Sequence, residues 1–430
     1  MTTRRFLLRG LLGAGLLGAG LLGLPAQTAA RMPEARTQAL DAAVGRLVEG
    51  RSTPGIVVLI LQDGVPVYSR THGSRDAEGR TPIGMDDLFR YASMTKMVTS
   101  VAAMILVEEG RIGLDDPVAR HLPAFANLQV RRPDGGLVAP ERAPTVRDLL
   151  THTAGFSYNF MNRPGLVELY RAAGVTDGLA DPDVSTAEAM RRLASVPLAH
   201  QPGAEYHYSL ATDVLGAVIE QVTGRPLGSF VSERIARPLG LESWVFRATP
   251  GMRDRFVPVT RPAQVTGALG TGFVPVTARE AMPFPASRGE ATLDPNRAFA
   301  PSAYHSGGGG MSGNIADYAR FLQMLANGGE LDGARILRAE TVREMTRNHT
   351  GALATLRGPG WGFGLGPGVL VDPAAANSRL PAGAWGWGGI YGTQFWVDPT
   401  NRVVGVVMTQ TAIIGSGPIA NAVREAFYAQ

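Results

Sequence analysis

Residues 93–110 read "SMTKMVTSVAAMILVEEG", an almost wholly apolar run that opens with a serine and a lysine three positions apart. A run that is apolar on every side is typical of a buried helix, and Gly110 is a common helix terminator. Of the 41 lysine and arginine residues in the chain, Lys96 is the only lysine. Since positions i and i+3 share a helix face, the spacing lets the Lys96 amine reach the Ser93 hydroxyl.

That pair predicts an activated nucleophile. A serine hydroxyl is a poor nucleophile until a neighbouring base takes its proton. Arginine cannot do so because its pKa exceeds 12, whereas burial and nearby charge can lower the pKa of a lysine from about 10.4 towards 7. A lysine that stays charged can instead lower the pKa of a nearby tyrosine. Ser-x-x-Lys is a weak pattern by itself, and a surface lysine is the alternative, but Met94, Met97 and Val98 are core residue types.

Strand patterns at both ends of the chain predict one antiparallel sheet. The runs "GIVVLILQ" (55–62) and "VPVYSRTHG" (65–73) flank an Asp-Gly turn, which indicates a hairpin. Near the other end, "GTQFWVDP" (392–399) and "RVVGVVMTQ" (402–410) form a second pair of strands around a Pro/Asn turn. Apolar periodicity predicts helices over 33–49, 93–110, 145–152, 211–224, 314–329 and 417–428.

The fold class expected is therefore α/β of the α+β type, with an antiparallel sheet from both termini, flanking helices and an inserted, mainly helical region. We expect one catalytic domain over 31–430. Within it, the sheet region covers about 31–92 and 305–430 and the helical region about 93–245. Residues 246–304 are rich in Pro and Gly and predict a loop-rich excursion, in which the repeated "FVPVT" suggests a local hairpin.

Residues 1–30 have the three-part layout of an export signal. A basic start is followed by a Leu/Gly/Ala run and by small residues that would allow cleavage near Ala30. Arg4 and Arg5 resemble a twin-arginine signal, with ordinary secretion as the alternative. The apolar run is short and Gly-rich for a membrane span, so an uncleaved anchor is the less favoured interpretation. We expect a periplasmic or extracellular protein with no stable membrane insertion once the signal is removed.

Composition narrows the classes of partner. The formal charge of +4 falls to +1 without Arg4, Arg5 and Arg9 (4 − 3 = 1), and no stripe of basic and aromatic residues appears, so no nucleic-acid partner is expected. With no cysteine, disulfides and thiol catalysis are excluded. Gly-x-Ser-x-Gly, phosphate-loop and His-Glu-x-x-His motifs are absent, and we expect neither metal nor cofactor. His305 before "SGGGG" is interpreted as part of a structural glycine turn. Nothing indicates the oligomeric state.

Several motifs in order carry a family resemblance. They are "SMTK" (93–96), "LLTHTAGF" (149–156), "PGAEYHYSLATDVLG" (202–216), "SGGGGMSGNIADYARFLQMLANGGELDG" (306–333) and "GWGGIYGTQFWVDP" (386–399). Together they resemble the class C β-lactamase-like serine hydrolases of the penicillin-binding-protein-like superfamily, most closely the family VIII carboxylesterases, over nearly all of 35–428.

The resemblance implies a β-lactamase-like fold and a set of site residues. Ser93 corresponds to the nucleophile, Lys96 to its activating partner, and Tyr208 to the family tyrosine, with Tyr206 as the rival candidate. Trp387, Gly388 and Gly389 occupy the position of the third family motif, a substrate-binding strand. The backbone N–H groups of Ser93 and Ile390 would form the oxyanion hole. Packing in the sheet is the alternative role for Trp387.

Two departures from the family pattern predict the substrate class. Leu210 replaces the family asparagine that binds an acyl amide, and Trp387 replaces a cation, so the substrate-binding surface is apolar. We therefore expect an exported serine hydrolase that cleaves small carboxylic esters through an acyl-enzyme on Ser93, with a small-molecule ester or amide as its partner. The alternatives are a β-lactamase or D-amino-acid peptidase of the same fold, an acyltransferase, and a catalytically silent binding or scaffold protein.

Overall fold

The computed structural model describes residues 32–429 except 162, 164, 181–182, 267–268, 285–288, 301–303 and 413–416. Residues Met32–Gln430 form one compact unit. The export signal predicted for residues 1–30 lies outside the described residues and stays a prediction. No helix in the described part of the chain is long and apolar enough to cross a membrane.

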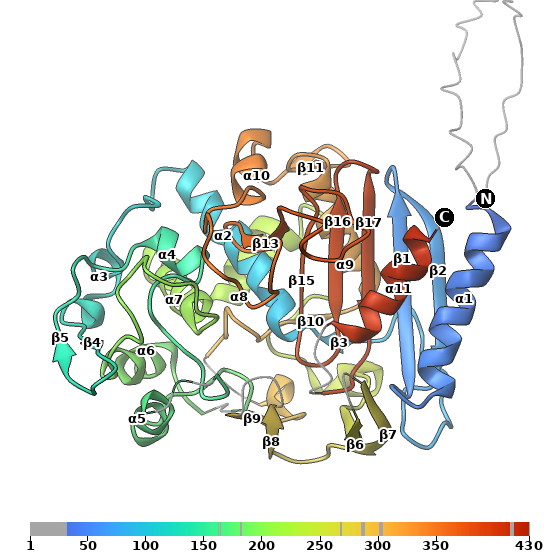
Figure 1. Ribbon diagram of the computed structural model, residues 1–430, viewed down its shortest axis with the longest axis horizontal. Coiled ribbons are helices and arrows are strands. Elements are labelled where there is room, and N and C mark those ends of the chain that lie inside the picture. The colour runs from blue at the N-terminus through green and yellow to red at the C-terminus, as the bar shows by residue number, and fades with distance from the viewer. Residues whose placement is uncertain are drawn as a thin grey trace, which may run out of the picture. The chain divides into compact units, whose positions relative to one another are not determined.

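A seven-stranded sheet runs through the centre of this unit (Figure 1) in the order β13-β14-β15-β16-β17-β1-β2, and every neighbouring pair is antiparallel. Strand β17 pairs directly with β1, which joins the two ends of the chain and confirms the predicted fold class. The strands are β1 (Gly55–Gln62), β2 (Val65–Gly73), β13 (Trp361–Phe363), β14 (Gly368–Leu370), β15 (Trp385–Gly388), β16 (Gln394–Asp398) and β17 (Val403–Met408).

Strand β1 is apolar from Ile56 to Leu61, as expected for a strand that is covered on both faces. Its side chains alternate between two cores, as the two-residue period of a strand requires. Ile56, Val58 and Ile60 pack against the helices α1 (Glu34–Glu49) and α11 (Pro418–Tyr428). Val57, Leu59 and Leu61 belong to the main core on the opposite face, where α9 (Ile315–Ala326) lies against β1 and β17.

The helical region is built around α2 (Thr95–Glu108), which continues a short 3-10 turn over Ala92–Met94. Helix α2 packs against α7 (Ala211–Thr223), and α4 (Val146–Leu150) packs on α7 in turn. The remaining helices are α3 (Val118–His121), α5 (Leu166–Ala172), α6 (Thr186–Ala194), α8 (Leu227–Val231) and α10 (Ala339–Met345). Short strand pairs are β3 (Phe89–Arg90) with β10 (Ser312–Gly313), β4 (Val130–Arg131) with β5 (Leu137–Val138), and β11 (Glu330–Leu331) with β12 (Ala334–Arg335).

The segment predicted as a loop-rich excursion contains more regular structure than expected. It forms two hairpins, β6 (Thr260–Thr266) with β7 (Leu269–Pro275), and β8 (Glu280–Phe284) with β9 (Gly289–Leu293). At the open end of the first hairpin, Thr260 of the first "FVPVT" copy lies opposite Pro275 of the second copy. Prolines inside these strands hide the strand pattern because proline is depleted in ordinary ladders, although pairs outside a large sheet tolerate it.

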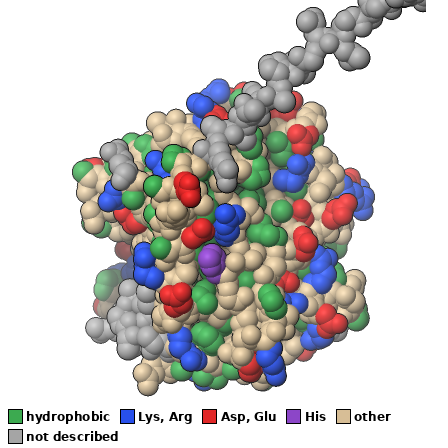
Figure 2. Space-filling model, turned by 90° about the vertical axis from the view of Figure 1, so that its right-hand side faces the viewer, with side chains coloured by type: hydrophobic (Ala, Val, Ile, Leu, Met, Phe, Trp, Pro, Cys, Tyr) green, Lys and Arg blue, Asp and Glu red, His purple; other side chains and the backbone are tan. Residues whose placement is uncertain are grey.

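Figure 2 shows how charged side chains are distributed over one face of the molecule. Basic and acidic side chains are interspersed there among apolar and neutral ones, and no basic patch gathers on it. This mixed charge agrees with the near-neutral net charge expected once residues 1–30 are set aside.

Candidate active site

Ser93 lies in the short turn that leads into α2, and the backbone of this turn is strained. Ala92, the residue before it, has a φ of 46°. Such a left-handed conformation costs a residue with a Cβ about 1–2 kcal/mol. Gly389, just beyond β15, approaches the same turn closely. A Cβ at Gly389 would lie 2.3 Å from the Tyr91 carbonyl oxygen, so a glycine is needed for β15 to end beside Ser93.

Lys96 is fully buried and uses its three donor positions. Its Nζ donates to the Ser93 Oγ at 3.3 Å, the Tyr158 hydroxyl at 2.9 Å and the Gly308 carbonyl at 2.7 Å. The amine also lies 4.7 Å from the centre of the Tyr208 ring. An ammonium has three N–H donors, so each one finds a partner in this site.

Tyr208 is the tyrosine that meets the serine. Its hydroxyl donates to the Ser93 Oγ at 2.6 Å, and the Trp387 Nε1 donates to the same hydroxyl at 3.4 Å. The rival, Tyr206, lies elsewhere: its ring packs on Phe363 at 5.2 Å, and its buried hydroxyl has no hydrogen-bond partner among the described residues. The geometry thus brings Ser93, Lys96 and Tyr208 together and leaves Tyr206 out.

Tyr158 is part of the site and was missed by the sequence analysis. Burial, reinforced by the neighbouring Tyr208 and Asp213, holds the pKa of Tyr158 well above its ordinary value of 10.0. This phenol is therefore protonated at neutral pH. The available signal was its place two residues after the quoted "LLTHTAGF" motif, within the aromatic run "GFSYNF" (155–160). Because spacing alone does not distinguish a site tyrosine from a packing one, that signal is weak.

The glycine run after His305 brings a backbone carbonyl to Lys96. A Cβ at Gly308 would lie 2.2 Å from the Asp213 Oδ2 and 3.0 Å from the Tyr158 hydroxyl, so this position has room only for glycine. Asp213 is buried and accepts hydrogen bonds from Tyr304 at 2.7 Å and Ser306 at 2.6 Å. His305 itself accepts from the Gly228 N–H at 3.0 Å and stacks on Phe246. The run is thus a structural turn that also supplies an acceptor for the amine.

The serine opens into a small pocket of about 100 Å³. Trp387, Gly388, Gly389 and Ile390 all line it, as the sequence analysis expected. The Ile390 N–H donates to no backbone carbonyl among the described residues. Leu210, also expected to contact substrate, is 2% exposed at the start of α7 and does not line the pocket, because its side chain is packed in the core. The other lining residues are Ser93, Tyr158, Phe160, Asp177, Leu179, Tyr208, Gly308 and Leu356.

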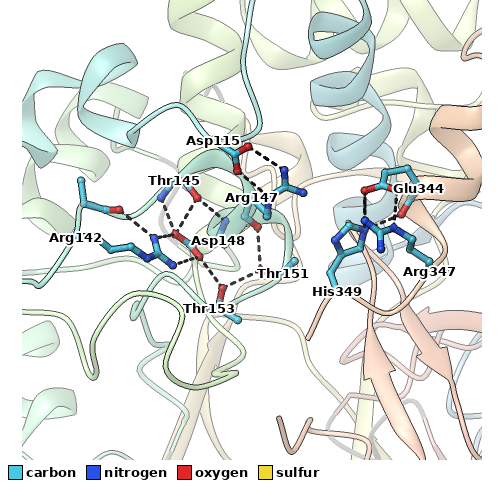
Figure 3. Close-up of polar contacts among 11 residues, drawn as sticks. Asp115, Arg142, Thr145, Arg147, Asp148, Thr151, Thr153, Glu344, Arg347 and His349 are labelled. Carbon is cyan, nitrogen blue, oxygen red and sulfur yellow. Dashed lines mark hydrogen bonds and ion pairs between the residues drawn. The ribbon is translucent and has the colours of Figure 1, made fainter. Parts of the chain in front are cut away.

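A polar network at α4 supports the segment that carries Tyr158 (Figure 3). The Asp148 carboxylate receives hydrogen bonds from Arg142, from the Thr145 N–H and hydroxyl, and from Thr153. Thr145 and Asp148 form a reciprocal capping box at the start of α4. Just beyond the helix, His152 adopts a φ of 56°. Figure 3 also shows the neighbouring ion pairs of Asp115 with Arg147 and of Glu344 with Arg347.

His152, between Thr151 and Thr153 of this network, packs against Tyr208. Its ring lies 4.8 Å from the ring of Tyr208, and its Nδ1 is hydrogen-bonded to the Ser209 Oγ at 3.3 Å. Burial, with the nearby charge of Lys96, holds the pKa of His152 well below 6.5. A neutral imidazole therefore packs beside Tyr208.

We expect the Asp148 network to make stability depend on pH. Burial alone would raise the pKa of Asp148, but the bonds from Arg142 and Thr145 outweigh it and the pKa is lowered. A lowered pKa means that the stabilisation is complete above the unfolded-state value near 3.9 and is lost as pH falls below it. Asp148→Asn should lower the free energy of unfolding at pH 7 by about 2–3 kcal/mol, with little further loss for the variant in acid.

Urea-unfolding midpoints of wild type and Asp148→Asn between pH 7 and pH 3.5 measure this. The difference in urea midpoint between wild type and Asp148→Asn should become smaller as the pH approaches 3.5. Asp115→Asn is a matched control because the Asp115 side chain is 78% exposed, and exposed ion pairs contribute little. If the difference in urea midpoint between wild type and Asp148→Asn is the same at pH 7 and pH 3.5, this account is wrong.

No three His, Asp or Glu side chains are grouped so as to hold a metal ion within the residues the structure describes. The side chains hydrogen-bonded around Ser93 and Lys96 are instead one amine, two phenols and one hydroxyl. Such a set can activate an oxygen nucleophile by proton transfer.

Comparison with known proteins identifies several chains that are related to this one in sequence and structure. Residues 40–428 match the family model described as "Beta-lactamase". Esterase EstB of Burkholderia gladioli is 39% identical over 398 residues, which cover 91% of this chain and 95% of that protein. Acyltransferase calJ of Penicillium decumbens is 28% identical over 398 residues, covering 85% and 87% of the two chains. The solved structure of EstCE1, a hydrolase with promiscuous acyltransferase activity, has a TM-score of 0.83 at 33% identity over 92% of this chain and 99% of its own.

Proposed function

The chain belongs to the beta-lactamase family and is a serine hydrolase of that fold, and from this premise we propose that it cleaves small carboxylic esters through an acyl-enzyme on Ser93. The observation that carries the proposal is the convergence on one oxygen. The Ser93 Oγ lies 2.6 Å from the Tyr208 hydroxyl and 3.3 Å from the Lys96 amine. Its relative Esterase EstB supports the same choice of substrate.

Acylation follows from these contacts. The Ser93 Oγ forms a bond to the ester carbonyl carbon as its proton passes to the oxygen of Tyr208, which acts as the base in its phenolate form. The buried Lys96 ammonium stabilises that phenolate, since an opposite charge favours the ionised state. The carbonyl oxygen gains negative charge and accepts from the backbone N–H groups of Ser93 and Ile390. The tetrahedral intermediate then collapses, and the departing alkoxide takes the proton from Tyr208.

Deacylation reverses the proton path. A water molecule replaces the alcohol, gives a proton to Tyr208 and attacks the acyl carbon. The Ser93 oxygen leaves and recovers its proton from Tyr208. Tyr158, whose raised pKa keeps it protonated, holds the amine in place from the other side through its 2.9 Å contact with Lys96. The same partners therefore serve both halves of the reaction.

The pocket supports a short, apolar acyl group. Its volume of about 100 Å³ is small, and Phe160, Leu179 and Trp387 contribute apolar surface to it. Such a pocket has few polar groups with which to select a peptide or an antibiotic. The export signal predicted for residues 1–30 supports a periplasmic or extracellular location, and this rests on the sequence alone.

Acyl transfer to an alcohol is a second candidate. Acyltransferase calJ is related over most of both chains, and EstCE1 is described as having promiscuous acyltransferase activity. An acyl-enzyme in an apolar pocket can pass its acyl group to any hydroxyl that enters. Adding butanol to the assay and measuring butyl ester formation separates transfer from hydrolysis.

A substrate panel tests the proposed function. We expect kcat/KM for p-nitrophenyl butyrate to exceed that for nitrocefin and for a D-Ala-D-Ala peptide by about 100-fold or more. Ser93→Ala supplies the background rate for each substrate, and a fluorophosphonate probe should label Ser93 in the wild-type protein. Nitrocefin or peptide turnover equal to ester turnover would favour the β-lactamase or peptidase alternative. An unlabelled Ser93 would favour a catalytically silent protein.

A further inference from the structure

The segment "LLTHTAGF" (149–156) places a buried histidine against the proposed base, and the mechanism of ester cleavage does not use this histidine. The ring of His152 lies 4.8 Å from that of Tyr208, with an angle of 53° between the two planes. The His152 carbonyl accepts from the His207 N–H at 2.8 Å, and its Nδ1 is hydrogen-bonded to the Ser209 Oγ at 3.3 Å. His152 therefore contacts Tyr208 and also the residues directly before and after it.

The backbone around His152 is fixed on both sides. The Thr151 and Thr153 hydroxyls are hydrogen-bonded to each other at 2.9 Å, and Thr153 also donates to the Asp148 carboxylate at 3.0 Å. The Thr153 carbonyl accepts from the Gly203 N–H at 2.8 Å. A strained conformation such as the φ of 56° at His152 persists only where the surrounding structure holds it. The His152 side chain thus projects from a rigid support.

Tyr208 itself lies in an irregular segment that ends at helix α7. Neither a helix nor a strand fixes its backbone. Yet its hydroxyl lies 2.6 Å from the Ser93 Oγ, the distance that proton transfer between the two oxygens requires. A displacement of about 1 Å at such a position can lower a reaction rate about 100-fold. The position of the phenol therefore depends on the side chains that pack around it.

His152 contributes contacts and no charge. Burial, with the nearby charge of Lys96, holds the pKa of His152 well below 6.5, so the imidazole is neutral at neutral pH. The cation beside the Tyr208 ring is Lys96, whose Nζ lies 4.7 Å from the ring centre. An effect of His152 on the reaction must then arise from where it holds the phenol.

We propose that His152 is a positioning residue that holds the Tyr208 hydroxyl in line with the Ser93 Oγ. This inference rests on the proposed role of Tyr208 as the base and extends it to the residue that places the base. Three properties are needed at position 152: a flat ring against Tyr208, a hydrogen-bonding atom for Ser209, and tolerance of a positive φ. Phenylalanine offers only the ring. Asparagine offers the atom and the tolerance, whereas histidine combines all three.

The first test removes the side chain without penalising the backbone. His152→Gly loses both the ring and the Nδ1, and glycine adopts a positive φ freely. We expect the rate constant of acylation by p-nitrophenyl butyrate, measured in a pre-steady-state burst, to fall about 50-fold. KM should stay within about threefold of wild type, because the side chain positions the base and does not bind the substrate. An acylation rate within threefold of wild type would overturn the inference.

A double-mutant cycle separates positioning from a general loss of packing. Tyr208→Phe removes the oxygen that His152 is proposed to place, so adding His152→Gly to it should lower the acylation rate less than threefold further. A general packing defect would instead multiply the two losses, to about 5 × 10⁴-fold in total. Single-turnover reactions with excess enzyme measure such slow rates, and Ser93→Ala gives the background. Multiplied losses would show that His152 does not act through Tyr208.

Graded variants and a matched control accompany the cycle. His152→Asn keeps a partner for Ser209, and His152→Phe keeps a ring, so each should retain more activity than His152→Gly. His200→Asn is the control: His200 is also buried with a lowered pKa, and its Nδ1 is hydrogen-bonded to the Gln201 carbonyl. Its acylation rate should stay within about twofold of wild type. Thermal midpoints check that every variant is folded.

A fluorophosphonate probe separates this inference from the esterase proposal. The probe reacts with Ser93 without an ester substrate, and its labelling rate should also fall about 50-fold in His152→Gly. If wild type is labelled but cleaves no ester, the esterase proposal alone is refuted, and the labelling rates still decide the role of His152. If esters are cleaved and His152→Gly reacts with both reagents within threefold of wild type, the positioning role alone is refuted.

Discussion

Replacing Lys96 with arginine should lower kcat for p-nitrophenyl butyrate by about 10³–10⁴-fold even though the positive charge is retained. Lys96 is 1% exposed, and its single nitrogen reaches Ser93, Tyr158 and Gly308 within 3.3 Å. A guanidinium is planar and larger than an ammonium, so it cannot direct three donors from one atom.

A companion variant separates chemistry from packing. Lys96→Met removes the charge and keeps a similar length, so a loss equal to that of Lys96→Arg shows that arginine's charge alone has no catalytic value. Thermal midpoints and circular dichroism check that both variants remain folded. Activity of Lys96→Arg within tenfold of wild type would show that a fixed positive charge is sufficient. The three hydrogen bonds from the single Lys96 nitrogen would then not be needed for catalysis.

The strands at the two ends of the chain were predictable because they form a large, two-sided sheet. β1 and β2 fall at the predicted residues, 55–62 and 65–73, since an Asp-Gly turn separates two runs of β-branched and apolar residues. The three-residue strands Trp361–Phe363 and Gly368–Leu370 carry no such signal. Two or three residues show no period, and their glycines favour turns. They are strands because they pair with each other and because the second also pairs with β15, and pairing partners are not visible in a local pattern.

The same distinction applies to the site. Ser93 and Lys96 were readable because helical geometry connects positions three apart, whereas Tyr208 lies 115 residues from Ser93 and needed the family likeness. The Gly308 carbonyl could not be predicted, because every residue carries a backbone acceptor and only the fold selects one. The sequence therefore predicted the contact between two residues close together in the chain, but it did not predict which distant segments would meet them.

Removing the hydroxyl of Tyr208 tests whether this tyrosine, and not a neighbouring one, is the base. We expect Tyr208→Phe to lower kcat about 10³-fold, because the Ser93 Oγ would lose its 2.6 Å partner and the Trp387 Nε1 would lose its acceptor. Tyr158→Phe should lower kcat only about tenfold, since it removes a contact to Lys96 and none to Ser93. The measurement is a pre-steady-state burst with p-nitrophenyl butyrate, which reports acylation directly.

Tyr206→Phe is the matched control for this pair. Its hydroxyl is buried and has no hydrogen-bond partner among the described residues, so its removal should leave kcat within about twofold of wild type and should not destabilise the protein. The three variants differ only in which phenol oxygen is lost. If Tyr208→Phe keeps the wild-type burst while Tyr158→Phe loses it, acylation depends on the Tyr158 phenol and not on the Tyr208 phenol. In that case Tyr208 would have to be reassigned from base to hydrogen-bond donor, because a phenol that can be removed without loss of acylation takes no proton from the nucleophile.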